Sequence, residues 1–401
     1  MHAFPASLDA HRVQSAPDRS VVDGRVRWAP VKSLWFLGMA GTAAVGGAMT
    51  FSLSAASLFV ACTATVLLFG HSLGSHRKLI HDSFQCPRWL EYLLVWCGVQ
   101  VGLAGPIGLL RQHELRDYAQ RLPDCHGYLR HGRPFWLDAW WQLNCDLVLD
   151  RPPQIAIEPR IANDRFYRFL ERTWMLQQLP PAVLLYAIGG WSFVIWGTCA
   201  RVTAGVFGHW LIGYFAHNHG GMHHVVQGAA VQGRNIRFTS LLTMGESWHN
   251  NHHAFPGSAR LGLFPGEWDP GWWMLVLLRR LGLVHGLRLA HHLPHRSELL
   301  AHDAVAQATG FDKTANTAGR SIVIRSPCAV LSSHSLREIA GVDAQVSVRQ
   351  DLRRLVVDVD GERHEGLAAL CRLAARRRGS VRLLARIALP IAACLNRCRV
   401  A

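Results

Sequence analysis

Two long stretches without charged side chains constrain the fold of this chain most. From Leu34 to Gly70 the chain contains no Lys, Arg, Asp or Glu. Since about 20 residues cross a bilayer once as a helix, this stretch predicts a helical hairpin that turns near residues 51–54. A second apolar stretch covers residues 173–216, carries only Arg201 as a charge, and is interrupted by Gly189 and Gly190. We expect a second hairpin there, and therefore an all-α integral membrane protein with four transmembrane helices.

Basic residues are distributed unevenly around these expected spans. Neither expected outer turn, at 51–54 or at 189–190, contains Lys or Arg. Basic residues instead flank the opposite ends of the spans: Arg25, Arg27, Lys32, Arg77, Lys78, Arg165, Arg168 and Arg172. An excess of Lys and Arg marks the cytoplasmic ends of membrane helices, so we expect both termini in the cytoplasm. We also expect the membrane to be a bacterial inner membrane. Residues 1–29 lack the features of a cleaved signal peptide.

The formal net charge of +15 would also suit a nucleic-acid-binding protein. The basic residues are dispersed along the tail and the segments that flank the expected spans, and they form no recognisable nucleic-acid-binding motif. We therefore expect no nucleic acid partner. Anionic membrane lipids, or an acidic or phosphorylated substrate, are the partners that this charge favours.

Composition divides the chain into three parts. Residues 1–30 form a polar leader, which we expect to be flexible and cytoplasmic. Residues 31–288 contain the apolar stretches and the expected membrane domain. Residues 289–401 have the composition of a soluble basic extension, with strand-like pieces at 321–325 and 354–359. The expected fold is thus two transmembrane hairpins with a cytoplasmic histidine-rich cap, followed by a soluble extension of unknown function.

Three further segments are expected at the membrane surface. Residues 89–110 are apolar enough to cross, but they contain an acidic residue, several glycines and a proline. If they crossed, His113 would lie on the opposite side of the membrane from His76, so we expect a re-entrant or interfacial segment. Residues 134–150 and 272–284 combine tryptophans with charges and are expected to be amphipathic interfacial elements.

A compact histidine cluster near the end of the membrane domain indicates metal binding. His249, His252 and His253 have the spacing i, i+3 and i+4, which places residues on one face of a helix. We therefore expect their imidazoles to turn toward one point. Imidazole nitrogens are suitable ligands for iron, zinc or copper.

Another histidine pair lies where the second expected span ends. His71 and His76 have the spacing i, i+5, which corresponds to about 500° on a regular helix. Both can face one site only if the helix ends or loosens between them, and Gly74 would allow this.

The remaining candidates lie between the hairpins and on the fourth expected span. His113 is followed by Asp117, a possible oxygen ligand, and by His126. His217 lies at the cytoplasmic end of the fourth span, where an ionisable side chain is costly without a partner. Together these residues predict a metal site on the cytoplasmic side.

At these residues the chain resembles the membrane fatty acid desaturases, in particular the acyl-CoA desaturase branch. The most specific match is residues 245–256, GESWHNNHHAFP, followed by DPGW at 269–272. The resemblance covers roughly residues 25–288. It implies a four-span enzyme that holds two Fe ions and introduces a double bond into an acyl chain, with acyl-CoA as the favoured substrate. Dioxygen and two electrons would be required, and a separate ferredoxin or cytochrome b5-type donor with its reductase would supply the electrons.

The resemblance also implies which residues bind the metals. The expected metal ligands are His71, His76, His113, Asp117, His126, His217, His249, His252 and His253. Glu246 and Asp124 are candidates to orient the imidazoles. His81 and His209 are weaker candidates, because such a histidine is more often an ordinary interior or surface residue.

The chain departs from the family pattern at two places. Arg116 and Asp117 stand where the family has two adjacent histidines, and Gly213 stands where the family often has an asparagine. A charged arginine has no lone pair for a metal, whereas a carboxylate is a good iron ligand. We therefore expect a mixed ligand set in which Asp117 takes part, together with His126 or His81.

Two alternatives remain open from the sequence. The same metal chemistry could end in hydroxylation of the acyl chain, which product analysis would reveal. The chain could instead be a metal-depleted membrane scaffold, which the substitution at Arg116 favours and the intact cluster at 249–253 opposes. The metal content of the purified protein separates this scaffold from an enzyme.

Overall fold

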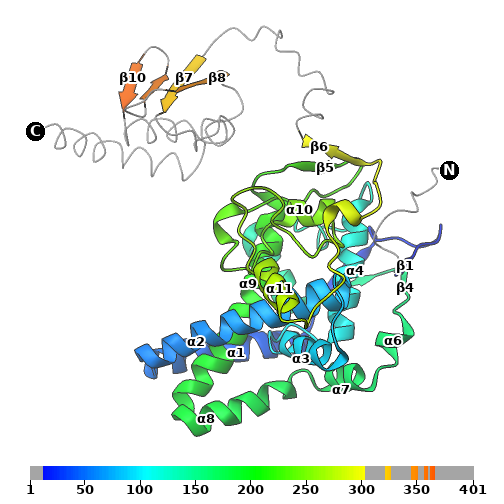
Figure 1. Cartoon of the computed structure of the whole chain (residues 1–401), viewed down its shortest axis with the longest axis vertical. Coiled ribbons are helices and arrows are strands. Elements are labelled where there is room, and N and C mark those ends of the chain that lie inside the picture. The colour runs from blue at the N-terminus through cyan, green and yellow to red at the C-terminus, as the bar shows by residue number, and fades with distance from the viewer. Residues whose placement is uncertain (1–11, 303–320, 327–344, 351–355, 360–361, 366–401) are drawn as a thin grey trace, which may run out of the picture. The chain divides into compact units, whose positions relative to one another are not determined.

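The computed structural model describes residues 12–302 and four strands of the C-terminal part. The chain divides into two units, residues 1–311 and 312–401. The described part of the first unit is mainly helical (Figure 1). Its helical segments are α1 (Pro30–Met49), α2 (Leu53–Thr65), η1 (Val66–Ile80), α3 (Arg88–Val99), α4 (Pro106–Arg121), α5 (Phe135–Asn144), α6 (Pro159–Ala162), α7 (Arg165–Thr173), η2 (Leu176–Gln178), α8 (Leu179–Val194), η3 (Ile195–Ala200), α9 (Arg201–Asn218), η4 (Arg237–Thr239), α10 (His249–Ala254), α11 (Pro270–Arg280) and η5 (Ala290–His292).

Among the residues that the structure describes, two helical segments are long and apolar enough to cross a membrane. They are residues 53–80, formed by α2 and η1, and residues 176–218, formed by η2, α8, η3 and α9. The second segment is broken at Gly189 and at Gly190, which has φ of +62° and so lies outside the helical region. The chain also turns between α1 and α2, where the side chain of Ser52 accepts a hydrogen bond from the Ala55 amide. Both breaks lie where the sequence predicts hairpin turns.

The two turns lie against each other. Ser192 donates a hydrogen bond from its hydroxyl to the carbonyl of Thr50, at 2.9 Å. The ring of Phe51 packs edge-on against Trp196, with the ring centroids 5.8 Å apart. These contacts join α1 and α2 to the region of α8 and η3.

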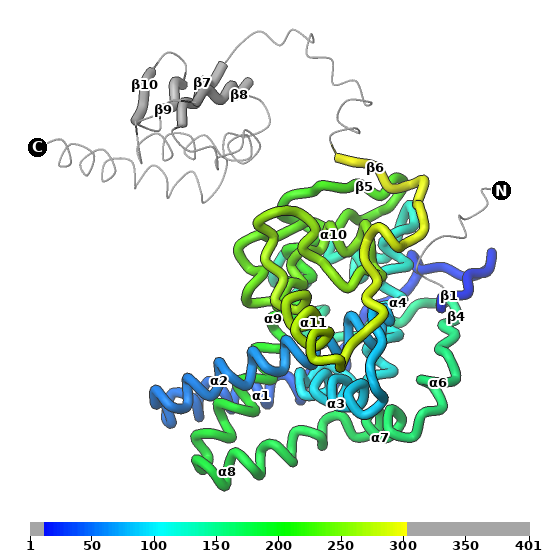
Figure 2. Tube along the Cα trace, viewed as in Figure 1, coloured from blue at the N-terminus to red at the C-terminus, as the bar shows by residue number. Residues whose placement is uncertain are grey.

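Large apolar side chains are exposed on α1, α2 and α8, which extend away from α4, α10 and α11 (Figure 2). No residue of α8 is buried. The exposed side chains include Leu34, Val45, Met49, Leu53, Val60, Val183, Leu184, Ile188 and Trp191. Apolar surface of this extent is unfavourable in water and stable in lipid, so these faces suit a membrane-associated protein.

Helix η1 is a π-helix that packs closely on α3. A Cβ atom at Gly70 would lie 2.2 Å from the carbonyl oxygen of Cys97, and one at Gly74 would lie 2.1 Å from that of Leu94. Gly74 therefore permits close helix packing. Of the two possibilities expected from the sequence, that the helix ends or loosens between His71 and His76, the structure shows the second, because the π-helix is wider than a regular helix. This packing fixes the helix that carries His71 and His76.

Residues 89–110 do not form one long helix. Helix α3 has 12 residues and ends before a break that precedes α4. Twelve residues are fewer than the about 20 that span a bilayer. The break lets α4 carry His113 to the same side of the structure as His76, as the sequence analysis required.

The expectation of a flexible leader differs from the structure over residues 12–30. Strand β1 (Val13–Gln14) pairs with β4 (Gln154–Ile155), and β2 (Gly24–Trp28) pairs antiparallel with β3 (Cys145–Leu149). Arg12 is 1% exposed and binds two carboxylates. Its partners are more than 100 residues away in the chain, so composition alone gave no sign of them.

The C-terminal strands fall in both units. Strand β6 (Leu299–Ala301) pairs with β5 (His224–Val226), so residues up to 302 lie with the first unit. In the second unit the strand order is β10–β9–β7–β8, with β7 and β8 parallel. These strands are β7 (Ser321–Ser326), β8 (Gln345–Gln350), β9 (Val356–Val359) and β10 (Glu362–Glu365). The strand-like pieces expected near 321–325 and 354–359 correspond to β7 and β9.

Candidate metal centre

The π-helix explains how histidines five residues apart can face one side. In a π-helix, hydrogen bonds connect residues i and i+5, so these residues lie nearly above one another. The rings of His71 and His76 are almost parallel, 9° apart. The amide of His81, five residues further on, donates a hydrogen bond to the carbonyl of His76. The same repeat therefore brings a third histidine, His81, to this side of the helix.

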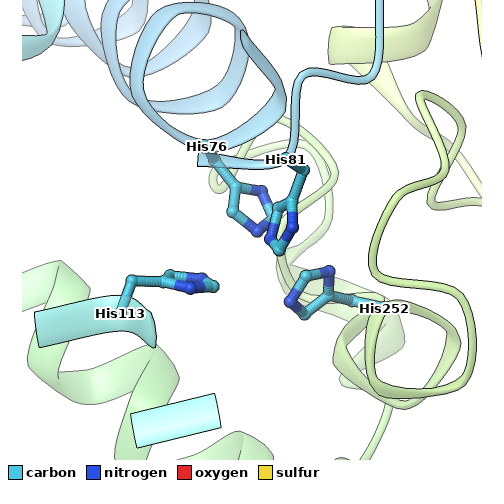
Figure 3. A group of neighbouring side chains, drawn as sticks. All are labelled: His76, His81, His113 and His252. Carbon is cyan, nitrogen blue, oxygen red and sulfur yellow. The ribbon is translucent and has the colours of Figure 1, made fainter. Parts of the chain in front are cut away.

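Four imidazoles from three segments form the first group, which we define as His76, His81, His113 and His252 (Figure 3). One donor nitrogen from each of them lies within 4.8 Å of the others. His76 and His81 come from the end of η1, His113 from α4 and His252 from α10. The four rings point toward a common centre from different elements, which is the arrangement that a metal ion requires.

Several of these nitrogens are buried without a hydrogen-bond partner in the described part of the chain. They are Nε2 of His81, Nδ1 of His113 and both ring nitrogens of His252. A buried polar atom without a partner costs free energy, and native proteins rarely leave one. A bound metal would satisfy these atoms, so the first group fits a metal site.

A carboxylate orients one ligand of the first group. Nδ1 of His76 lies 2.6 Å from Oε2 of Glu246, so the carboxylate favours the proton on Nδ1 and leaves the lone pair of Nε2 for a metal. Glu246 also pairs with Arg77 at 2.8 Å and accepts a hydrogen bond from Ser72. Burial would raise the pKa of Glu246, but His76 and Arg77 hold it below the usual range. Asp124, the other expected orienting carboxylate, is exposed and contacts Arg130 instead.

Asp117 lies at the edge of the first group. Its Oδ2 atom is 3.6 Å from Nδ1 of His113 and 3.8 Å from Nε2 of His252. Burial would raise the pKa of Asp117, but the electrostatic attraction of the nearby imidazoles of His113 and His252 holds it well below the usual range. The side chain is therefore a carboxylate within reach of a metal bound by the first group.

The second group consists of His217, His249 and His253. Their three Nε2 atoms are 3.0, 3.1 and 3.4 Å apart. Three imidazole nitrogens that bind one ion at about 2.0–2.1 Å, with angles of roughly 90° to 110°, lie about 2.9–3.4 Å from one another. Nδ1 of His217 lies 2.6 Å from the carbonyl of Gly213, so Nδ1 carries the proton and Nε2 faces the other two rings. The second group also fits a metal site.

The spacing predicted that the three histidines of α10 turn toward one point, but they do not. His249 and His253 belong to the second group, and His252 belongs to the first. On a helix, residues 252 and 253 project about 100° apart, which directs them to different centres. Helix α10 therefore joins the two groups.

Burial keeps the histidines of α10 in the form that binds metals. It lowers the pKa of His249 to about 3, together with the charge of His252. It lowers the pKa of His252 to about 4, together with the charge of His76. These imidazoles are neutral near pH 7, and a neutral imidazole has the lone pair that a metal needs.

Two of the expected histidine ligands lie outside both groups. His71 has its buried Nδ1 without a partner in the described residues and packs edge-on against His209, with the centroids 5.1 Å apart. His126 stacks on Trp141 at 6.2 Å, and its Nδ1 accepts a hydrogen bond from the Tyr128 amide. His81, a weak candidate from sequence, lies in the first group instead. Its five-residue spacing from His76 was the signal that could have identified it.

A cavity of about 930 Å³ reaches both groups. His76 and His113 of the first group and His217 and His249 of the second line it. Apolar side chains also form its wall: Trp35, Phe36, Leu109, Leu143, Val206, Trp210 and Ile212. Arg27 and Lys32 line it as well. This volume and lining suit a long apolar molecule with an acidic or polar end.

Comparison with known proteins gives one consistent result. The model of the family described as fatty acid desaturase matches residues 29–263. The chain is 34% identical over 276 residues to an sn-1 stearoyl-lipid 9-desaturase of Anabaena variabilis, covering 66% of this chain and 95% of that protein. It is 33% identical to an sn-2 palmitoyl-lipid 9-desaturase of Nostoc, covering 67% and 92%. It is 32% identical to an acyl-CoA 5-desaturase of Anemone leveillei, covering 62% and 76%.

Proposed function

The chain belongs to the fatty acid desaturase family and desaturates fatty acyl chains, and we propose that two iron ions, one at each histidine group, support this reaction. The observation that carries the proposal is the convergence of seven imidazoles into two groups that reach one cavity. Imidazole and carboxylate donors of this kind suit iron.

The ligands of the first iron are the four imidazoles of the first group together with Asp117. The ligands of the second iron include the three imidazoles of the second group. His71 lies close enough to His76 to support the first group, with the ring centroids 6.5 Å apart. We leave His126 out of this set, because its ring packs on Trp141 and its Nδ1 is engaged by the backbone.

The protein has to place the acyl chain and exclude water from it. When bound, iron with dioxygen and two electrons supplies the oxidising power to remove hydrogen from an unactivated methylene, which no side-chain acid or base can deprotonate. The cavity wall of aromatic and aliphatic side chains binds the acyl chain beside both groups. Glu246 and the carbonyl of Gly213 hold His76 and His217 in the correct tautomer.

We propose acyl-CoA as the substrate. Two of the relatives named above are lipid desaturases and one is an acyl-CoA desaturase, so relatives act on acyl groups carried by lipids and by CoA. Arg27 and Lys32 line the cavity, and their charges would attract the phosphates of CoA. A comparison of acyl-CoA with the same acyl chain on a phospholipid, both offered to the purified enzyme with its electron donor, tests this choice.

We also propose how the chain lies in the membrane. Helices α1 and α2 with η1, and α8 with η3 and α9, form two hairpins with four spans. Two observations support this topology. The helix is interrupted at Gly189 and Gly190, and large apolar side chains are exposed on these segments. We propose that both termini and the metal site lie in the cytoplasm, which the basic residues flanking the inner ends support, and that the membrane is a bacterial inner membrane. A separate ferredoxin or cytochrome b5-type protein with its reductase supplies the electrons. Residues 289–401 form a soluble C-terminal extension of unknown function.

The test is expression in a host that lacks unsaturated fatty acids. We expect the wild-type chain to add a double bond to the host's acyl chains, and the His252→Ala variant to add none. Lipid profiling by mass spectrometry measures both. An alcohol in place of the double bond would identify a hydroxylase, and purified protein without iron would identify a scaffold.

A further inference from the structure

One buried histidine beside the second group has no role in the function proposed above. His131 lies in the connection between α4 and α5 and is 3% exposed. Its φ angle is +53°, in the left-handed region that side chains other than glycine rarely adopt. Such strain persists where the surroundings hold a residue in place, and it is concentrated at functional sites. Resting on the proposed pair of iron ions, we propose that His131 is a fourth imidazole ligand of the second group.

A carboxylate fixes the tautomer of His131. Its Nδ1 lies 2.9 Å from Oδ2 of Asp138, which is completely buried. The same oxygen accepts a hydrogen bond from the indole of Trp210, at 2.8 Å, so Asp138 is held from a second side. Nδ1 of His131 therefore carries the proton and Nε2 has the lone pair. Histidines that bind metals are oriented by carboxylates in this way.

The ring of His131 lies against the second group. It is parallel to the ring of His217 within 10°, with the centroids 5.4 Å apart. A Cβ atom at Gly213 would lie 2.9 Å from Nε2 of His131. The ring thus occupies the space next to position 213, where the sequence has no side chain. The glycine at 213 and the histidine at 131 are complementary, and both line the cavity beside His217.

Arg116 competes for the lone pair of His131. One guanidinium nitrogen contacts Nε2 of His131, and another donates a hydrogen bond to Oε1 of Gln142, at 2.9 Å. In this arrangement Nε2 of His131 contacts Arg116 and is not among the three close donors of the second group. Metal binding by His131 requires the first nitrogen of Arg116 to leave, while the bond to Gln142 holds the side chain nearby. His131 would thereby replace the ligand that Arg116 cannot supply.

The experiment measures metal content, independently of activity. The full chain is purified in detergent, loaded anaerobically with ferrous iron, and its bound iron is determined by mass spectrometry. We expect about two irons in the wild type and about one in His131→Ala. His219→Ala is the matched control, since this exposed histidine lies two residues from His217, and it should keep both. The thermal melting temperature and the elution volume show whether each variant is folded.

Double variants assign the lost iron to a group. His131→Ala combined with His217→Ala should lose no more iron than either change alone, because both remove the same ion. His131→Ala combined with His252→Ala should lose both ions. Arg116→Gln removes the competing cation and should raise the affinity for the second iron on the order of 10-fold. This is the lower end of the change in metal affinity that residues next to metal ligands produce.

The outcomes separate this inference from the proposed function. Wild-type protein that binds no iron would refute the proposed di-iron site. Wild-type protein with two irons and His131→Ala with the same two at unchanged affinity would refute only the role of His131. The role is also refuted if folded His131→Ala loses both irons, or if Arg116→Gln lowers or leaves unchanged the affinity for the second iron.

Discussion

The two histidine groups differ in the number of their donors and in what holds those donors. The first group has four imidazoles with Asp117 at its edge, and buried ion pairs lie next to two of these imidazoles. Arg77 pairs with Glu246 behind His76, and Arg12 pairs with Glu114, the residue next to His113. The second group has three imidazoles, and the carbonyl of Gly213 orients one of them.

We propose that this difference follows from the residues at two adjacent positions, 116 and 117. In this proposal Asp117 supplies an oxygen donor to the first group, since it lies 3.6 Å from His113. Arg116 can supply no donor to the second group, because a charged guanidinium has no lone pair. The first site would then be complete, and the second would depend on a residue elsewhere in the chain.

The largest effect should come from His252→Ala. His252 belongs to the first group and lies next to His253 of the second in the short helix α10. Its loss should abolish desaturation. The decrease in activity should exceed the about 10–100-fold decrease that follows when a residue that orients a metal ligand is removed. Product formation in whole cells measures this effect. Activity within a few-fold of wild type would show that the first group is not the reacting site.

The next largest effect should come from Arg12→Ala. Arg12 donates to Glu114, to Glu158 and to the carbonyl of Ile80, at 2.6 to 2.9 Å. Removing it leaves buried Glu114 without this partner, which costs about 3–5 kcal/mol in comparable buried pairs. Thermal unfolding should therefore shift strongly, and iron should be lost from the first group before the second. Arg19→Ala, which removes a partly exposed arginine of the same leader, is the control.

If Arg12→Ala unfolds at the wild-type temperature and keeps both irons, the leader does not brace the first group. The two groups would then differ only in their donors. A loss of the second iron alone would mean that the leader supports the second group instead. Among the residues that the structure describes, Arg12 contacts no member of that group.

Asp117→Ala should have an intermediate effect. It removes the carboxylate that lies 3.6 Å from His113 and 3.8 Å from His252, and should weaken iron binding at the first group about 10–100-fold. Asp117→His restores an imidazole donor and should recover most of the binding. Iron titration of the purified variants measures both. Full activity of Asp117→Ala would exclude Asp117 as a ligand.

Gly213→Ala should weaken the second group alone. The added methyl group would lie 2.9 Å from Nε2 of His131, and such overpacking costs about 1–3 kcal/mol. Gly208→Ala on the same helix is the matched control, because a Cβ atom there meets nothing within 4 Å. We expect lower affinity for the second iron in Gly213→Ala only. Equal behaviour of the two variants would show that the space beside His217 is not tightly filled.

The sequence predicted the parts of the site that depend on local spacing or on a family pattern. The short helix at 249–254 follows from spacing, although its three histidines divide between the two groups. The ends of the apolar stretches follow from composition. Arg12 escaped prediction because its partners are distant in the chain. His81 was undervalued because a five-residue repeat aligns side chains only in a π-helix, and local sequence predicts regular helices more readily.

The smallest effect should come from His126→Ala, which tests the difference between sequence and structure directly. The family pattern places His126 among the ligands, whereas the structure packs its ring on Trp141, away from both groups. Its removal costs one hydrogen bond from the Tyr128 amide, and changes of this kind are usually within about 0.5 kcal/mol. Iron content should therefore stay at the wild-type level. Loss of one iron would mean that the loop carrying His126 turns inward when metal binds, so that the second group would gain its fourth ligand from position 126 rather than from position 131.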